Sequence, residues 1–161
     1  MPYKVSTTGM TELEQMLREA GDAAQGAASA GLYEGAGVIA DAVSRAVQGI
    51  ATKPFRYAVG GYKRMPSPEE KELLEAAPKG VAKFKKNGLS VSTSVGLSRS
   101  GYGQLGSKTK PVPQIANAIN SGTSFMNKQP FFRKAVSQNA GKALEVMDKK
   151  IREKIDEKLN K

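Results

Sequence analysis

The sequence contains no cysteine and no histidine. Without cysteine there is neither a disulfide framework nor a thiolate zinc site. Without histidine the commonest metal ligand and the usual general base are both missing. Metal-dependent and triad-type catalysis are therefore not expected, and we expect no cofactor, although counting alone does not exclude carboxylate chemistry.

Acidic residues are also missing from a long internal window. Between Glu75 and Glu145 there is no Asp or Glu, although the first 80 residues carry 9 basic and 10 acidic side chains and the last 81 carry 16 and 5. Charge of one sign cannot be neutralised within such a segment, so it must face solvent, counterions or an acidic partner. The window holds eleven basic residues: Lys79, Lys83, Lys85, Lys86, Arg99, Lys108, Lys110, Lys128, Arg133, Lys134 and Lys142.

No targeting or membrane segment is expected. The first four residues lack the apolar stretch of a signal peptide, and charged residues interrupt the most apolar run, residues 32–50. The length of 161 residues suits one domain, residues 1–161, with a hydrophobic core. We expect a soluble protein that is made in the cytoplasm and has no membrane partner.

Two helices are predicted in the first third of the chain. Thr11 and Glu14 form a capping-box pattern for a helix that runs to about residue 20. Residues 22–49 are rich in Ala and Gly and predict a second, longer helix, in which each Gly costs about 1 kcal/mol relative to Ala. Close packing against a sheet or another subunit would compensate for this cost. A frayed helix with irregular turns is the alternative.

Three further helices are predicted downstream. Ser67 and Pro68 are typical of a helix start, which predicts a short helix over residues 68–77 within an irregular connection, residues 51–80. Residues 113–120 predict another short helix. From Phe132 to Leu159, apolar residues recur every three or four positions, which predicts a long amphipathic helix.

The middle of the chain predicts strands. Apolar and small polar residues alternate over residues 89–98, as in a strand with one buried face. Asn87-Gly88 is a tight-turn signal, so residues 81–86 are the expected hairpin partner. Residues 99–112 are interpreted as a mobile basic loop. The predicted class is α+β, with a small antiparallel sheet flanked by N-terminal helices and one long C-terminal helix.

Basic residues stand beside aromatic residues at three places, around Tyr62, Phe84 and Phe131. Proteins that bind single-stranded nucleic acid use such pairs for stacking, but core aromatics beside solvated cations are the alternative. The glycines of residues 101–106 lack the Walker spacing, which favours a flexible loop over a phosphate cradle. The carboxylates lie at helix starts or among lysines at helical spacing. We therefore expect no enzyme.

Residues 115–135 carry the most specific pattern in the chain. Gly122-Thr123 follows a short apolar helix, and Pro130-Phe131-Phe132-Arg133-Lys134-Ala135 opens the last helix. This segment resembles the signature of the neck or tail-completion proteins of long-tailed bacteriophages. The resemblance covers roughly residues 68–160. Asn120-Ser121 stands where that family often has an acid, Gln129 stands where it has Arg, and the connection over residues 51–80 is longer than usual.

The physics of this signature suits a fold element. Gly122 suits a backbone position with positive φ after a helix, and Pro130 suits the first turn of the next helix. Phe131 and Phe132 are expected to anchor that helix onto the sheet. The residues of the signature expected to fix the fold are Gly122, Thr123, Pro130, Phe131, Phe132, Arg133 and Ala135.

The resemblance implies a ring-forming structural subunit of the phage neck that completes the tail or joins it to the DNA-filled head. Its implied partners are further copies of itself, head-closure, tail-terminator and tail-tube subunits, and possibly the DNA that passes through the neck. Its implied location is the head–tail junction of the virion, after assembly in the host cytoplasm. A basic nucleic-acid-binding protein is the alternative. The candidate residues that face partners or DNA are Lys83, Lys85, Lys86, Arg99, Lys108, Lys110, Lys128, Arg133 and Lys134.

Overall fold

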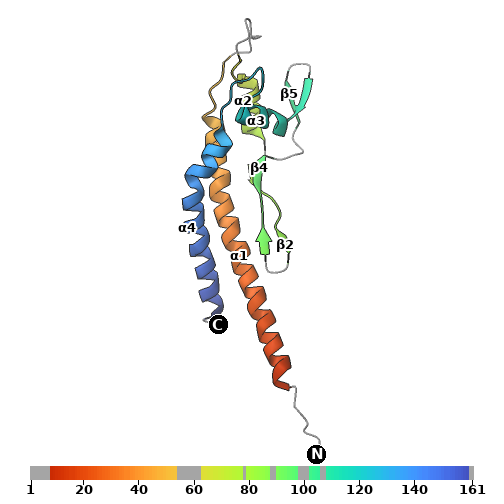
Figure 1. Cartoon of the computed structure of the whole chain (residues 1–161), viewed down its shortest axis with the longest axis vertical. Coiled ribbons are helices and arrows are strands. Elements are labelled where there is room, and N and C mark those ends of the chain that lie inside the picture. Colours follow the sequence, from red (N-terminus) through yellow and green to blue (C-terminus); the bar gives the residue numbers. More distant parts are fainter. Residues whose placement is uncertain are drawn as a thin grey trace, which may run out of the picture.

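The computed structural model describes residues 8–53, 63–77, 79–87, 90–97, 102–105 and 108–159. Within them, only the backbone is described for residues 8–14, 16, 17, 79, 102–105, 108–110 and 159. The fold is α+β, as predicted. Two long helices run antiparallel along the molecule, and two short helices and two β-hairpins lie beside them (Figure 1).

Helix α1 (Thr8–Gln48) is one continuous helix of 41 residues. The prediction of two helices that meet near residue 21 is wrong, and so is the predicted N-cap at Thr11, because the helix already begins at Thr8. The frayed alternative is also absent, since the glycines lie within regular helix. At Gly31 and Gly35 the missing side chain lets a neighbouring helix approach, whereas an added Cβ atom at Gly21 would meet nothing within 4 Å.

That neighbour is α4 (Phe131–Leu159), which begins one residue before the predicted start. A Cβ atom built on Gly31 would lie 2.8 Å from the backbone oxygen of Met147, and one on Gly35 would lie 2.2 Å from the Met147 Cγ. The backbones of α1 and α4 therefore approach each other more closely than larger residues would permit. Close packing thus occurs at Gly31 and Gly35, but the partner is a helix of the same chain, α4, and not the expected sheet or second subunit. At Gly26 and Gly37 an added Cβ atom would meet nothing within 4 Å.

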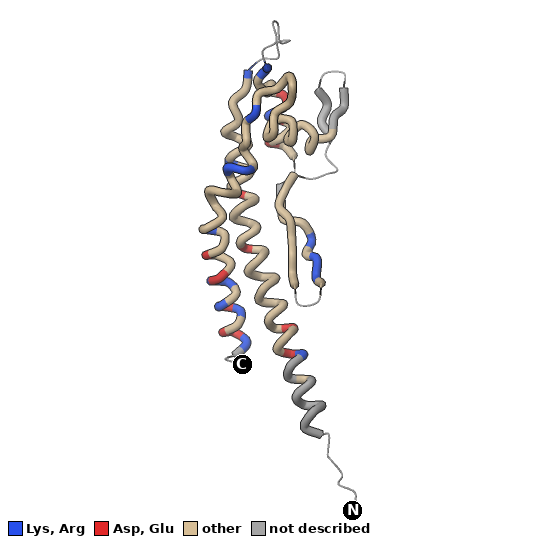
Figure 2. Tube along the Cα trace, in the orientation of Figure 1, with Lys and Arg blue, Asp and Glu red and all other residues tan. Residues whose placement is uncertain are grey.

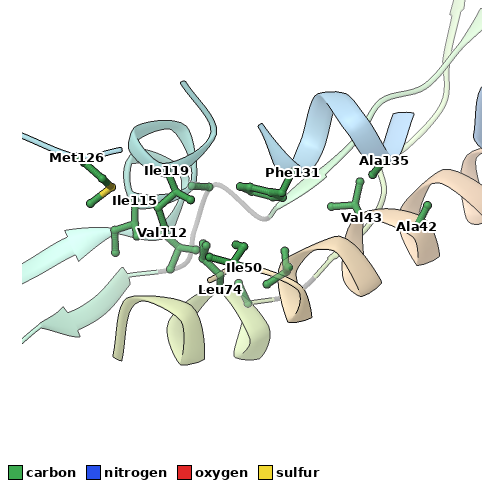
Figure 3. Close-up of a cluster of buried hydrophobic side chains, with 13 residues drawn as sticks. Ala42, Val43, Ile50, Leu74, Val112, Ile115, Ile119, Met126, Phe131 and Ala135 are labelled. Atoms are coloured by element: carbon green, nitrogen blue, oxygen red, sulfur yellow. The ribbon is translucent and has the colours of Figure 1, made fainter. Parts of the chain in front are cut away.

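The hydrophobic core lies where α1 ends and α4 begins. Helices α2 (Pro68–Ala76) and α3 (Val112–Ser121) cover this end of the pair, and both match the predicted short helices. Buried side chains from all four helices meet there (Figure 3). The most completely enclosed of them contribute roughly 1.5–3 kcal/mol each through burial: Val43, Val47, Leu74, Ile119 and Met126.

The first hairpin is long and carries a bulge. Strand β1 (Lys79–Val81) pairs with β4 (Val95–Leu97), and β2 (Lys85–Asn87) pairs with β3 (Ser90–Ser92). Three residues on the first arm, 82–84, oppose two on the second, 93 and 94, so the ladder is interrupted by one extra residue. The predicted alternation is confirmed over residues 90–95, where Val91, Thr93 and Val95 are half-buried and the intervening serines are exposed.

A second hairpin occupies the segment expected to be a loop. Strands β5 (Tyr102–Leu105) and β6 (Lys108–Pro111) pair antiparallel within residues 99–112. The prediction of a loop is therefore wrong for the eight residues of these two strands. Its sequence lacks a clear apolar alternation, which explains why the strands were missed. No helix in the described ranges is both long enough and apolar enough to cross a membrane.

Candidate functional site

The family-like segment begins at the end of α3. Gly122 is the C-cap residue with φ +77°, and its N–H donates to the Ala118 carbonyl at 2.9 Å. A Cβ atom there would lie 3.2 Å from the Lys128 nitrogen, so both conformation and space favour glycine. The prediction of positive φ at Gly122 is confirmed.

A tight turn follows. The Thr123 hydroxyl accepts hydrogen bonds from the N–H groups of Phe125 at 3.3 Å and Met126 at 3.0 Å. This turn directs the Met126 side chain into the core, where it is 2% exposed. The role of Thr123 is therefore to shape the backbone between α3 and α4.

Two side chains that depart from the family pattern stabilise the start of α4. The Asn120 Oδ1 atom accepts from the Phe132 N–H at 3.1 Å, which satisfies a free donor in the first turn of α4. The Gln129 amide accepts from the Ala51 N–H at 3.0 Å and donates to the Ala51 carbonyl at 2.8 Å. An arginine could donate to the Ala51 carbonyl but could not accept from its N–H, so only a side chain such as glutamine makes both bonds.

Pro130 and the two phenylalanines begin the last helix. Pro130 was predicted in the first turn of α4, but it lies one residue before the helix begins. Its carbonyl accepts a hydrogen bond from the Lys134 N–H at 3.1 Å. Phe131 is 7% exposed and Ala135 is 4% exposed, and both lie in the core between helices. Phe131 and Phe132 both line a small cavity of about 200 Å³ with Leu97 of β4, so the predicted contact of the phenylalanines with the sheet is present. Phe131 also packs in the core with residues of α1, α2 and α3, which was not predicted.

A buried ion pair supports this segment and was not predicted. Both Arg64 Nη atoms donate to the Glu70 carboxylate at 2.7 Å, and the two side chains are only 13% and 7% exposed. Glu70 also accepts from the Ser67 N–H at 2.9 Å and completes the capping box of α2. The Arg64 backbone bonds to Phe125 and Asn127, so the pair ties α2 to the turn before α4.

The candidate basic residues fall into separate groups (Figure 2). Lys83, Lys85 and Lys86 are exposed on the first hairpin, whereas Lys128, Arg133 and Lys134 are exposed at the start of α4. Phe84 contacts Tyr33 of α1 with ring centroids 6.3 Å apart, which places the hairpin beside Tyr33. Arg45, which lies beside α4, is twelve residues after Tyr33 on α1, and at a rise of 1.5 Å per residue this separates the two by about 18 Å along the helix axis. The hairpin lysines and the cations beside Arg45 are therefore separate groups. Arg99 lies outside the described residues, and Lys108 and Lys110 are described only as backbone of β6.

Lys128 and Lys134 line a cleft together with Arg45 of α1. We call it the α1/α4 cleft: it has a volume of about 590 Å³ and lies between residues 42–50, at and just after the end of α1, and residues 128–139, just before and in the first turns of α4. Alanines and Phe131 supply apolar walls, and among the residues that the structure describes no carboxylate lines it. Its three cations are Arg45, Lys128 and Lys134.

The C-terminal half of α4 shows the opposite arrangement. Three of its cations are matched by acids one helical turn away: Lys150 with Glu153 at 3.3 Å, Arg152 with Asp148 at 2.8 Å and Lys154 with Glu157 at 2.6 Å. In the part of the chain that the structure describes, no salt bridge reaches the three cations of the α1/α4 cleft. The cleft is therefore suited to an acidic group from outside the chain.

The aromatic residues beside the cations are mostly used for packing. Phe131 is buried, Phe132 is half-buried, and Phe84 is half-buried against Tyr33. Tyr62 lies outside the described residues. The stacking interpretation is therefore unsupported for Phe131, whose ring is covered.

Among the described residues, no group of three or more acidic, histidine or cysteine side chains could hold a metal ion. Comparison of the chain with models of protein families, with curated proteins and with solved structures found no match.

Proposed function

We propose that this protein is a ring-forming structural subunit of the neck of a long-tailed bacteriophage, which completes the tail or joins it to the DNA-filled head. One observation carries the proposal. The segment that resembles the neck family, residues 115–135, folds as one connected unit in which most of its distinctive residues have a structural task, whereas Arg133 is exposed. Gly122 and Thr123 set the turn, Phe131 and Ala135 fill the core, and Pro130 starts α4.

The construction of this unit supports a structural role. Ile115, Ile119, Met126, Phe131 and Ala135 are buried in the core, whereas Phe125 is exposed, as are Lys128, Arg133 and Lys134. The unit that fixes the fold thus also carries positive charge on its surface. Such a surface binds acidic neighbours, either adjacent rings of the neck and tail or the phosphates of DNA that crosses the neck.

The shape of the molecule is also compatible with ring assembly. The antiparallel α1–α4 pair makes an elongated body, and the short helices and hairpins lie along one side of it (Figure 1). The two flanks of such a body differ in structure and charge. A ring uses two different surfaces of each copy, one for each neighbour, until the rotation closes.

The proposal is tested by mass photometry of the purified chain. It is measured alone and after mixing with the head-closure, tail-terminator and tail-tube proteins encoded beside it. We expect one discrete assembly mass that is an integral multiple of the chain mass, and closed rings in negative-stain images. A chain that stays monomeric with every one of these partners overturns the proposal.

A nucleic-acid-binding protein is the second candidate, and the exposed lysines of the first hairpin favour it. Lys83, Lys85 and Lys86 lie together there, away from the α1/α4 cleft. This function requires an affinity for duplex or single strand that falls steeply with salt, with a slope of about −0.9 per phosphate contacted on duplex DNA. Fluorescence anisotropy with labelled oligonucleotides measures it. Absence of binding at low salt would exclude this candidate.

A further inference from the structure

Two surfaces of opposite charge lie on opposite flanks of α1. A helix turns by about 100° per residue, so Arg45 points roughly 160° away from both Val43 and Val47. Those two valines lie in the core with Leu74 of α2, whereas Arg45 lines the α1/α4 cleft. The Arg45 side of the cleft therefore faces away from α2, while the inner wall, with Ala42 and Ile50, belongs to the same core as Leu74.

Helix α2 presents acids on its outer side. Glu70 and Leu74 form its buried side, and Glu72 lies about 160–200° around the helix from them. Glu69 is its neighbour on the same exposed side, about 4.5 Å away along the axis. Glu75 is paired with Lys71 at 3.8 Å, but within the described chain no salt bridge reaches Glu69 or Glu72. We call Glu69 and Glu72 the α2 acidic face.

We propose that the α2 acidic face of one copy docks against the α1/α4 cleft of the next copy. The inference rests on the proposed ring function and names the contact that builds the ring. Within one copy the two surfaces cannot meet, because α1 lies between them. Between copies they form a contact of two different patches, which is the kind that repeats around a ring.

A second copy fits the cleft better than nucleic acid does. Three cations, Arg45, Lys128 and Lys134, surround a cleft whose walls include the apolar side chains of Ala42 and Ala46. Phosphate contacts need cations but gain nothing from apolar walls. A short helix brings both components, two carboxylates and the methyl groups and side-chain stems around them.

Charge reversal tests the contact. The cleft variant carries Arg45→Glu and Lys134→Glu, and the α2 variant carries Glu69→Lys and Glu72→Lys. Each variant alone places like charges together at every contact, so we expect its self-association to weaken roughly a hundredfold or more. An equimolar mixture of the two variants is expected to assemble again, because every contact in an alternating ring then joins opposite charges.

The matched control is Lys85→Glu with Lys86→Glu on the first hairpin. It changes the net charge by the same amount as the cleft variant, and we expect it to assemble like the parent chain. Far-UV circular dichroism checks that each variant is folded. If the α2 variant is not folded, Glu69→Gln with Glu72→Gln replaces it and is expected to weaken association by a smaller factor.

The outcomes separate this inference from the function on which it rests. Rings that form equally well in the cleft and α2 variants overturn the inference and leave the neck function standing. In another outcome, the parent chain forms rings only when a tail or head-closure partner is added. If the cleft variant then forms them equally well, the inference is again overturned and the neck function stands. A cleft variant that keeps self-association but loses binding to DNA or to an acidic partner assigns the cleft to that occupant and overturns the inference. A parent chain that never assembles with any partner overturns both.

Discussion

The close approach of α1 and α4 predicts that Gly31→Ala destabilises the protein. The new Cβ atom would lie 2.8 Å from the backbone oxygen of Met147 and 2.5 Å from Cγ1 of Ile151. The isoleucine side chain can rotate, but the backbone oxygen moves only if α4 moves. Inserting an atom into such a contact costs about 1–3 kcal/mol.

A second glycine of the same helix provides the control. Gly37 has nothing within 4 Å of the position of an added Cβ atom, so Gly37→Ala is expected to stabilise the protein by about 0.4–1 kcal/mol. Alanine improves helix propensity by about 1 kcal/mol at both positions. That gain cancels when the two variants are compared, and the difference between them, about 1–3 kcal/mol, measures the packing cost.

Urea unfolding followed by far-UV circular dichroism measures both variants at one protein concentration. The midpoints give the free energies of unfolding if the slope m is the same for both variants and the parent. Gly31→Ala should unfold at lower urea than the parent, and Gly37→Ala at higher urea. If the two variants agree to within about 0.5 kcal/mol, the α1–α4 approach described above is refuted.

Three further substitutions test the framework of the family-like segment. Glu70→Ala removes both hydrogen bonds from the half-buried Arg64 guanidinium to the carboxylate and the bond from the Ser67 N–H, and should cost about 3–5 kcal/mol in urea unfolding. Glu72→Ala should change stability by less than about 0.5 kcal/mol; equal effects would contradict the ion pair. Asn120→Asp places a negative charge at the start of α4 and should raise the free energy of unfolding by about 0.3–1 kcal/mol at low salt. A thermal melt measures this, and a loss of stability would contradict the capping role of residue 120. Gly122→Ala should cost about 1–3 kcal/mol because of its backbone conformation, while Gly141→Ala, in open space on α4, should stabilise by up to about 1 kcal/mol; tolerance of alanine at 122 would show that the positive φ is not required.

Elements with strong local signals were predicted well from the sequence. Ser67, Pro68 and Glu70 specify the start of α2 through hydrogen bonds within four residues, and the structure shows the complete capping box. The alternation in residues 90–95 likewise depends only on neighbouring positions. Gly122 was recognisable because a positive φ after a helix is a local requirement.

The errors arose where distant residues decide the structure. The glycine-rich stretch of α1 suggested fraying, but the contacts that hold Gly31 and Gly35 come from Met147 and Ile151, more than one hundred residues away. For Phe131 the sheet contact was foreseen, but its place in the core with α1 and α3 could not be known from its neighbours. A sequence pattern shows that a residue is apolar, but not which element covers it.

The candidate site was predictable only in part. The absence of acids from residues 76–144 predicts that Lys128 and Lys134 find no acid in their own segment, and among the described residues no salt bridge includes either of them. The third cation of the cleft, Arg45, comes from outside the window and meets them only because α1 and α4 lie side by side. Arg64 was counted among the basic residues beside aromatics, yet its charge is matched by Glu70.

Immunogold electron microscopy of purified particles tests the central claim most directly. An antibody against this protein is applied to virions of the phage that encodes it. The proposed neck function predicts gold at the junction between head and tail, on heads that carry tails. Particles that are infectious and carry no label at that junction, with the protein absent from their mass spectra, would contradict it.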